Sequence, residues 1–480
     1  MSSIKKNFLY NVLYQFLILV LPLITAPYIS RVLGVEGIGI YSYSYSVASI
    51  FLLFANLGIL NHGNRSIAAN RDDRSRLSST FINIYTVQII IGILVSLIYF
   101  VYIKIFFISN SNIAVIQSLL VLSALFDISW VFFGLEKHKL IVVRNTILKI
   151  LTVLAVFIFV KDQTDLWKYV LIMALGVLVS QLIMWKFVKN YIDFIKPSII
   201  EVRRHIKPIV VLFLPVLAYS IYRIMSKIML GNMTTMTEVG YFENADKIVI
   251  IPMGIITALG TVMLPRISNL VANGKGDKQR EYIDKSMKFV TIVASGLSFG
   301  LAGIADIFAP VYFGDNFAHS GVLIKYLAIT ILFASWASVI RTQYLIPNKM
   351  DKIYVLSMTV AAFVNIVLNF IFIPKFQSSG AIVGTITAEF LVMILQFWSL
   401  RKTIIIKQYC KDNYWYILFG LIMFAFLKML GWMLGVGILT LIIQICTGGL
   451  MYIGLTFAFM YIKKDEMLRS MIHWRKIVHK

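Results

Sequence analysis

Apolar segments of about 20 residues alternate along the chain with short polar connections. A helix needs roughly 20 mostly apolar residues to cross a bilayer, and it satisfies its own backbone hydrogen bonds there. The pattern therefore predicts an all-α polytopic membrane protein with about 14 transmembrane helices. The predicted spans are residues 7–30, 38–60, 80–104, 113–135, 141–160, 168–188, 209–231, 241–264, 289–313, 319–346, 353–373, 380–400, 414–430 and 435–462.

The composition favours a membrane protein over a soluble one. Of the 480 residues, 59% are hydrophobic and 14% are charged, whereas soluble domains are about 45–50% apolar and about 25% charged. A soluble fold of this length cannot bury that much apolar surface. The composition thus excludes a soluble enzyme and a disordered chain.

The charge of the connections is strongly uneven. The chain has 45 Lys and Arg against 22 Asp and Glu, a formal net charge of +23. With a cytoplasmic N-terminus, 33 of the 45 basic residues fall in inner connections and 5 in outer ones. Because Lys and Arg accumulate in cytoplasmic loops, we expect both termini inside. The basic face would then meet anionic membrane lipids, and nucleic acid is not expected as a partner.

Two parts of the chain resemble each other at an offset near 200 residues. Residues 30–34 match residues 226–231, and residues 65–70 match residues 266–273. Such internal repeats are common in secondary transporters, and six spans per repeat give both halves the same orientation. We therefore expect an N-terminal lobe at residues 1–208, a C-terminal lobe at 209–412, and a helix pair with a basic cytoplasmic tail at 413–480.

Basic residues within or beside the spans are candidates for binding an anion. Arg223 and Lys227 share a helix face, and Arg31 is the repeat counterpart of Lys227. Lys247 is a further candidate, although Glu243 lies four residues before it and is a natural ion-pair partner. Charge within a membrane usually faces a cavity or a partner, so both interpretations stay open; Lys227 is also close enough to the interface to extend into water.

Other charged residues in the spans suggest ion pairs or coupling sites. Asp127 and Lys149 are at similar depth on adjacent spans, and so are Asp306 and Lys325. Each pair is either a structural ion pair or part of a gate. Glu389 lies near the middle of its span and either carries a coupling ion or bonds to a neighbouring helix. The spacing of the His and Cys residues predicts no metal site, and no cofactor motif is present.

Four segments carry recognisable motifs: residues 26–41, 227–231, 238–247 and 262–266. They resemble the motifs of bacterial oligosaccharide flippases, the O-antigen and capsule repeat-unit translocases of the MOP/MATE superfamily. The resemblance implies two six-helix lobes in a V around a central cavity, in the bacterial cytoplasmic membrane. It further implies flipping of undecaprenyl-pyrophosphate-linked oligosaccharide to the outer leaflet, for a polysaccharide polymerase machinery to use.

The resemblance also implies roles for the basic residues. Cations in the cavity attract pyrophosphate or acidic sugars, and on this chain they would be Arg31, Arg223 and Lys227. Many relatives have Asp where this chain has Ser226, which argues against carboxylate-based ion coupling at that position.

Alternatives from other classes remain. A peptidoglycan-precursor flippase also has fourteen spans, whereas a drug/cation antiporter favours about twelve and an acidic cavity. A membrane enzyme such as a polysaccharide polymerase or ligase commonly needs a large external loop, and all outer connections of this chain are short. We therefore expect a transporter rather than an enzyme.

Overall fold

The computed structural model describes residues 3–106, 110–401 and 406–465, and these residues form helices and no β-strand. The chain divides into two compact units, Met1–Gly240 and Tyr241–Lys480. Residues 466–480, most of the expected basic tail, lie outside the described residues. The first unit contains α1 (Ser3–Asn56), α2 (Ile59–Asn70), α3 (Arg74–Phe106), α4 (Ser111–Ser123), η1 (Ala124–Phe126), α5 (Ser129–Gly134), α6 (His138–Phe159), η2 (Gln163–Asp165), α7 (Leu166–Val188), α8 (Ile199–Met233) and the start of α9 (Met236–Ala272). The second contains the rest of α9, α10 (Gly276–Phe313), η3 (Asp315–Phe317), α11 (Ala318–Leu327), α12 (Ile329–Ile340), η4 (Arg341–Leu345), α13 (Asp351–Ser399), α14 (Ile406–Leu434) and α15 (Ile438–Ile462).

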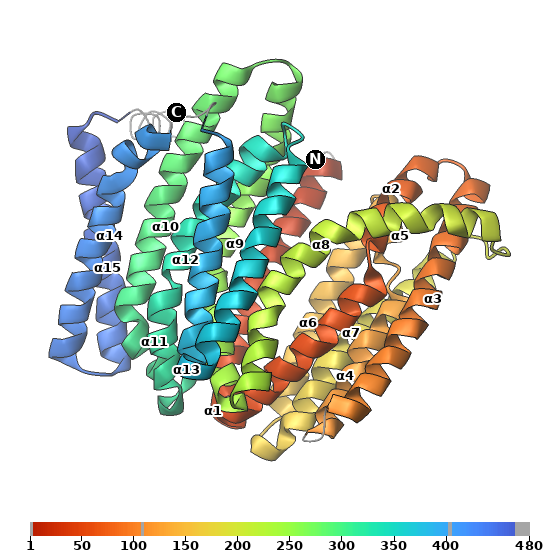
Figure 1. Ribbon diagram of the computed structural model, residues 1–480, viewed down its shortest axis with the longest axis horizontal. Coiled ribbons are helices and arrows are strands. Elements are labelled where there is room, and N and C mark those ends of the chain that lie inside the picture. Colours follow the sequence, from red (N-terminus) through yellow and green to blue (C-terminus); the bar gives the residue numbers. More distant parts are fainter. Residues whose placement is uncertain (1–2, 107–109, 402–405, 466–480) are drawn as a thin grey trace. The chain divides into compact units, whose positions relative to one another are not determined.

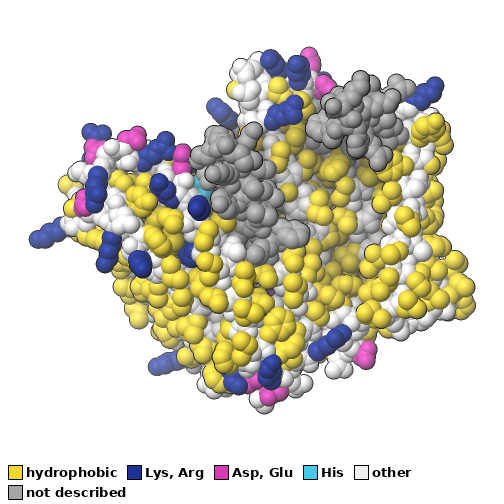
Figure 2. Space-filling view, turned by 180° about the vertical axis from the view of Figure 1, so that it is seen from behind, with side chains coloured by type: hydrophobic (Ala, Val, Ile, Leu, Met, Phe, Trp, Pro, Cys, Tyr) yellow, Lys and Arg dark blue, Asp and Glu magenta, His cyan; other side chains and the backbone are white. Residues whose placement is uncertain are grey.

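Many of these helices are built to cross a membrane. Among the described residues, ten are long and apolar enough, or eleven if the bent pair Asp315–Leu327 and Ile329–Leu345 is one span. Ile90, Leu94 and Leu97, on one face of α3, are each more than half exposed, as expected of lipid-facing side chains. Figure 2 shows broad areas of hydrophobic side chains on one face, with many Lys and Arg toward its upper and lower edges. The multi-pass membrane class is therefore confirmed; the number of fourteen spans and the orientation stay predictions.

Two of the longest helices are interrupted where the sequence predicts a connection between spans. In α1 the interruption is at Gly34, whose φ of 70° and ψ of 178° are not helical. Glycine accepts this positive φ without the strain that a side chain would cause. In α13 it is at Gln377, with a φ of 52° and a ψ of −131°. Figure 1 shows the chain reversing direction within α1 and within α13.

A third interruption was not predicted. The segment expected as one span at 113–135 consists of α4, η1 and α5, and Asp127 between η1 and α5 has an extended backbone. Gln88 of α3 donates hydrogen bonds to the carbonyls of Ala124 (2.6 Å) and Asp127 (2.9 Å). Trp130 Nε1 donates to Gln88 Oε1 at 3.1 Å. Broken helices occur within membranes only where protein satisfies the freed backbone groups, and Gln88 does so here.

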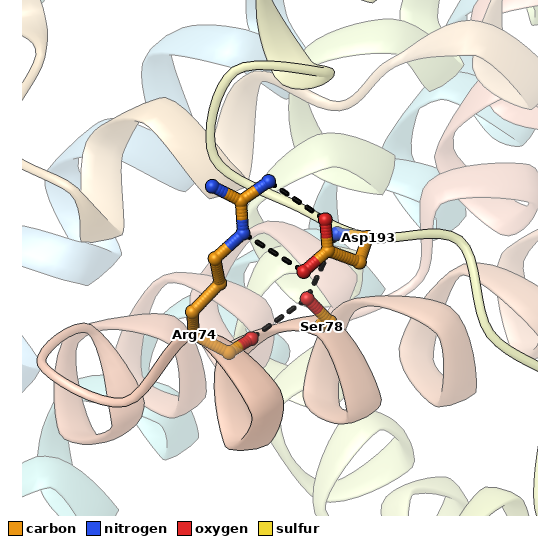
Figure 3. Close-up of polar contacts among 3 residues, drawn as sticks. All are labelled: Arg74, Ser78 and Asp193. Carbon is orange, nitrogen blue, oxygen red and sulfur yellow. Dashed lines mark hydrogen bonds and ion pairs between the residues drawn. The ribbon is translucent and has the colours of Figure 1, made fainter.

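A clamp of polar groups joins the start of α3 to the loop after α7 (Figure 3). Arg74 makes two hydrogen bonds to the Asp193 carboxylate, at 2.8 and 2.7 Å. Ser78 Oγ accepts the backbone N–H of Asp193 at 2.9 Å and donates to the carbonyl of Arg74 at 2.7 Å. Because Arg74 holds the carboxylate in its charged form, the pKa of Asp193 is lowered from its ordinary value. The clamp fixes how the α7–α8 loop packs against the start of α3 within the first unit.

The C-terminal helix pair, α14 and α15, packs against α10 of the second unit. Tyr416, Met423, Leu427 and Tyr452 are buried in one apolar cluster there. The Tyr452 hydroxyl donates to the carbonyl of Ile292 on α10 at 2.7 Å. A β-carbon at Gly296 would lie only 2.8 Å from the Tyr452 ring, so a residue without a side chain is needed for the helices to approach this closely. The pair is therefore an integral part of the second unit.

Candidate functional site

The three cations expected to attract an anion all belong to the first unit. Arg31 is exposed on α1, three residues before the interruption at Gly34, while Arg223 and Lys227 are half-buried on α8. Arg223 and Lys227 are four residues apart and therefore lie on one face of the helix. Each of the three takes part in polar or electrostatic interactions within the protein.

The face of α8 next to Arg223 and Lys227 packs against the rest of the first unit. Ser226 and Leu230 are buried, with 3% and 0% of their surface exposed. Gly231 lies against the ring of Tyr43 on α1, where any side chain would collide with it. The Tyr43 hydroxyl donates to Asn232 Oδ1 at 2.5 Å. These contacts fix the rotation of α8, and they leave Arg223 and Lys227 beside the packed surface rather than inside it.

Arg223 and Lys227 have side chains that can bind anions. A guanidinium presents several N–H donors in one plane and binds phosphate or carboxylate through two hydrogen bonds, while an ammonium acts as a point charge. Two such groups on one helix face suit an anion with more than one charge, such as a pyrophosphate.

Lys247, the fourth predicted cation, has a partner that compensates its charge. Lys247 Nζ lies 3.0 Å from Glu243 Oε1, and only 10% of the Glu243 side chain is exposed. This is the i,i+4 pair that the sequence offered as the alternative interpretation. Lys247 belongs to the second unit, and its assignment to cargo binding stays a prediction.

The predicted pair of Asp306 and Lys325 forms, and it has a third member. Lys325 Nζ lies 3.5 Å from Asp306 Oδ1, and Lys428 of α14 pairs with Asp306 Oδ2. The carboxylate on α10 thus lies between ammonium groups from α11 and α14. Comparison of depth between adjacent spans does not connect Lys428 with Asp306, because the two residues are 122 positions apart. The cluster ties three helices of one unit together, and its assignment to a gate or coupling site stays a prediction.

The other predicted pair does not form. Within the described part of the chain no ion pair joins Asp127 and Lys149. Asp127 Oδ1 instead accepts the backbone N–H of Ser129 at 3.0 Å, capping the start of α5. The expectation assumed a continuous helix over 113–135, and the interruption at η1 turns this carboxylate toward its own backbone. Lys149 is half-buried on α6.

Glu389 lies on the second half of α13 and is half-buried between the buried residues Ala388 and Val392. Residues 3–106, 110–401 and 406–465 contain no group of three or more His, Cys, Asp and Glu side chains placed to hold a metal ion. The assignment of Glu389 to ion coupling or gating therefore stays a prediction.

Comparison with known proteins identifies a sequence family. The family described as "Polysaccharide biosynthesis protein" matches residues 4–271. The Escherichia coli (strain K12) protein named "Putative O-antigen transporter" is 24% identical over 406 residues, which are 83% of this chain and 97% of that protein. The Staphylococcus aureus "Capsular polysaccharide biosynthesis protein CapF" is 22% identical over 414 residues, 83% of this chain and 99% of that protein.

Solved structures agree on the fold. The "Lipid II flippase MurJ, inward closed conformation" has a TM-score of 0.77 at 15% identity, covering 95% of this chain and 100% of that one. An inward-facing multidrug resistance MATE family transporter of the MOP superfamily has a TM-score of 0.57 at 13% identity, covering 77% of this chain and 94% of that one. Together these matches confirm the resemblance that the sequence motifs indicated.

Proposed function

Because the chain belongs to the polysaccharide biosynthesis protein family, we propose that it flips undecaprenyl-pyrophosphate-linked oligosaccharide repeat units from the inner to the outer leaflet of the cytoplasmic membrane. The units then serve surface polysaccharide synthesis, where a polymerase machinery takes them up. The names of the O-antigen and capsule relatives support this cargo class.

One structural observation connects the proposed function with particular residues. Arg223 and Lys227 lie together, half-buried, on one face of α8, next to the surface through which α8 packs on α1. Two cations on one face of α8 offer charge-assisted hydrogen bonds to a pyrophosphate. In this proposal they attract the pyrophosphate of the carrier, and Arg31 adds positive charge beside the interruption of α1 at Gly34, on the predicted outer side.

The proposed topology has fourteen spans with both termini in the cytoplasm. The interruptions at Gly34 and Gln377 support it, because each divides one long helix into two pieces of spanning length. The concentration of Lys and Arg in alternate connections supports the orientation. Six spans in each lobe and a terminal pair would then work by alternating access, with the cargo exposed to one side at a time.

We propose transport without a covalent step. Flipping requires the carrier's charged headgroup to pass the apolar core, so the protein's task is to replace the water around the pyrophosphate with fixed cations. Movement of the lobes then completes the transfer of the cargo across the membrane, and no bond in the cargo forms or breaks. In this proposal the chain is a transporter rather than a polymerase or ligase.

The experiment is complementation in a strain lacking this protein and any redundant flippase. We expect lipid-linked repeat units to accumulate in the inner leaflet and surface glycan to disappear, with both restored by the wild-type gene. Arg223→Ala should reduce surface glycan at least tenfold at equal protein level, and Arg223→Lys should retain part of it. Arg204→Ala is the matched control, since Arg204 is exposed on the same helix and pairs locally with Glu201.

The same strains separate the alternatives. Normal surface glycan without the protein would overturn the proposal. Rescue of cells depleted of their lipid II flippase would indicate a peptidoglycan precursor as cargo. Loss of drug resistance with unchanged surface glycan would indicate a drug/cation antiporter.

A further inference from the structure

A cavity of about 540 Å³, open to the surface, lies in the first unit, where the start of α4, after the α3–α4 connection, meets the α6–α7 connection. Its lining includes Asn110, Ser111 and Asn112 at the start of α4, and Thr164 and Trp167 around η2 and the start of α7. Ile113, Ile116 and Leu166 supply the apolar part. Both connections are on the outer side in the proposed topology, so the cavity is on the side where cargo emerges.

The start of α4 is fixed by hydrogen bonds. Asn110 adopts a left-handed conformation with a φ of 63° and a ψ of 26°, and its carbonyl accepts the N–H groups of Ile113 (3.1 Å) and Ala114 (3.3 Å). The Tyr99 hydroxyl of α3 donates to the carbonyl of Ala114 at 2.9 Å. Ile113 is only 7% exposed. The three polar side chains at 110–112 are thus presented from a firmly placed helix end.

The opposite wall is equally well held. Asp162 Oδ1 accepts the backbone N–H of Thr164 at 2.8 Å and also its hydroxyl proton at 2.5 Å. Asp165 accepts the N–H of Lys161 at 2.8 Å and pairs with Lys168 at 2.5 Å, with 7% of its own side chain exposed. These bonds order the turn that carries Trp167. A cavity with two ordered walls needs little rearrangement to bind a ligand.

The lining defines the chemistry of the ligand. Among the described residues, no side chain that lines the cavity is charged. The Lys168 ammonium lies 5.8 Å from the centre of the Trp167 ring, where the Asp165 carboxylate balances its charge. Two amides and two hydroxyls offer both donors and acceptors, which an acyl chain would leave unsatisfied. Trp167, 47% exposed, supplies a broad aromatic ring. Flat aromatic faces pack against the C–H groups of a pyranose while amides and hydroxyls bond its hydroxyl groups.

We propose that this cavity binds an uncharged pyranose ring of the glycan, as an outer-side subsite separate from the cations that attract the pyrophosphate. The assignment of the ligand to the cargo glycan rests on the proposed function. The affinity for a neutral sugar does not, because it follows from the lining alone. The site would hold the emerging oligosaccharide at the outer surface while the carrier completes its passage.

Sugar binding is measured directly on the purified full-length protein by saturation-transfer NMR, with glucose, N-acetylglucosamine and glucuronate as probes. We expect transfer to the two neutral sugars, and at least fivefold weaker transfer in Trp167→Leu and Asn112→Ala. Trp167→Tyr should retain much of the signal because it keeps an aromatic face. Trp432→Leu is the control, since Trp432 is 87% exposed on α14 and should leave the signal unchanged.

Equal transfer in the wild type and Trp167→Leu, no transfer to neutral sugars, or stronger transfer to glucuronate would each overturn the subsite. Thermal midpoints of all variants, compared with the wild type, show that any loss is not unfolding. Surface glycan in the deletion strain distinguishes this inference from the proposed function. If the wild-type gene fails to restore glycan but the purified protein binds sugar through Trp167, the function fails and the subsite stands; restored glycan with sugar binding independent of Trp167 gives the reverse.

Discussion

Asp306 of the second unit forms ion pairs with two lysines. It faces the ammonium groups of Lys325 and Lys428, and its side chain is 45% exposed against 24% and 29% for the two lysines. An exposed ion pair contributes little, whereas a half-buried carboxylate shared by two cations also keeps those cations from repelling each other.

We predict that Asp306→Asn lowers the thermal midpoint of the purified protein, because two ammonium groups are left facing each other. The expected cost is about 1–2 kcal/mol, between the values typical of exposed and of buried ion pairs. Asp315→Asn makes the same chemical change at an exposed residue of η3 and should have little effect. Equal midpoints for the two variants would contradict the role given to Asp306.

Asp193 leads to a prediction about pH. Arg74 lowers its pKa in the folded protein, so the pair contributes stability above the ordinary Asp pKa of about 4 and loses it as the pH falls through the lowered value. The thermal midpoint of the wild type should therefore exceed that of Asp193→Asn at pH 7, and the difference should shrink as the pH falls below the ordinary Asp pKa of about 4. A difference that persists or grows on acidification would contradict this account.

At the scale of elements, the α10–α14–α15 packing depends on small residues at the contact. We predict that Gly296→Ala destabilises the protein by about 1–3 kcal/mol, since its β-carbon would lie 2.8 Å from the Tyr452 ring. Gly454→Ala is the matched control, because no atom lies within 4 Å of a β-carbon at that position of α15. It should be neutral or stabilising, as alanine favours helix. Comparison of the thermal midpoints of the two variants tests this prediction.

The helices also show which features of the fold can be predicted from the sequence. Apolar length predicted the helical pieces, and it separated the spans at Gly34 and Gln377 where the backbone turns. The interruption at Asp127 escaped it, because no proline or glycine marks residues 124–128. What makes that interruption possible is Gln88, 39 residues earlier, whose amide satisfies the freed carbonyls. Such a tertiary contact has no periodic signal.

The candidate site was predictable in part for the same reason. Charge in an apolar span stands out, so Arg223, Lys227 and the Asp306–Lys325 pair could be named from composition and depth. Lys428 could not be assigned to that pair, and the cavity beside Trp167 could not be found, because two connections about 50 residues apart form it. Uncharged polar residues in connections are too common to attract notice.

For the whole molecule, the uneven charge of the connections makes a prediction about topology. In a variant with both native cysteines replaced by serine, Lys375→Cys should react with a membrane-impermeant maleimide in intact cells, whereas Ser198→Cys should react only after lysis. Both positions are exposed, so accessibility reports the side of the membrane rather than burial. The opposite labelling pattern would reverse the proposed orientation.

The central claim, that this chain flips a pyrophosphate-linked glycan, is tested most directly in proteoliposomes. The measurement is the fraction of a fluorescent undecaprenyl-pyrophosphate oligosaccharide that becomes accessible to a membrane-impermeant quencher on the opposite leaflet. We predict translocation with the wild type, at least tenfold slower translocation with Arg223→Ala, and the wild-type rate with Arg204→Ala. A rate with the wild type no higher than in protein-free liposomes, under imposed proton and sodium gradients as well as without them, would contradict the account.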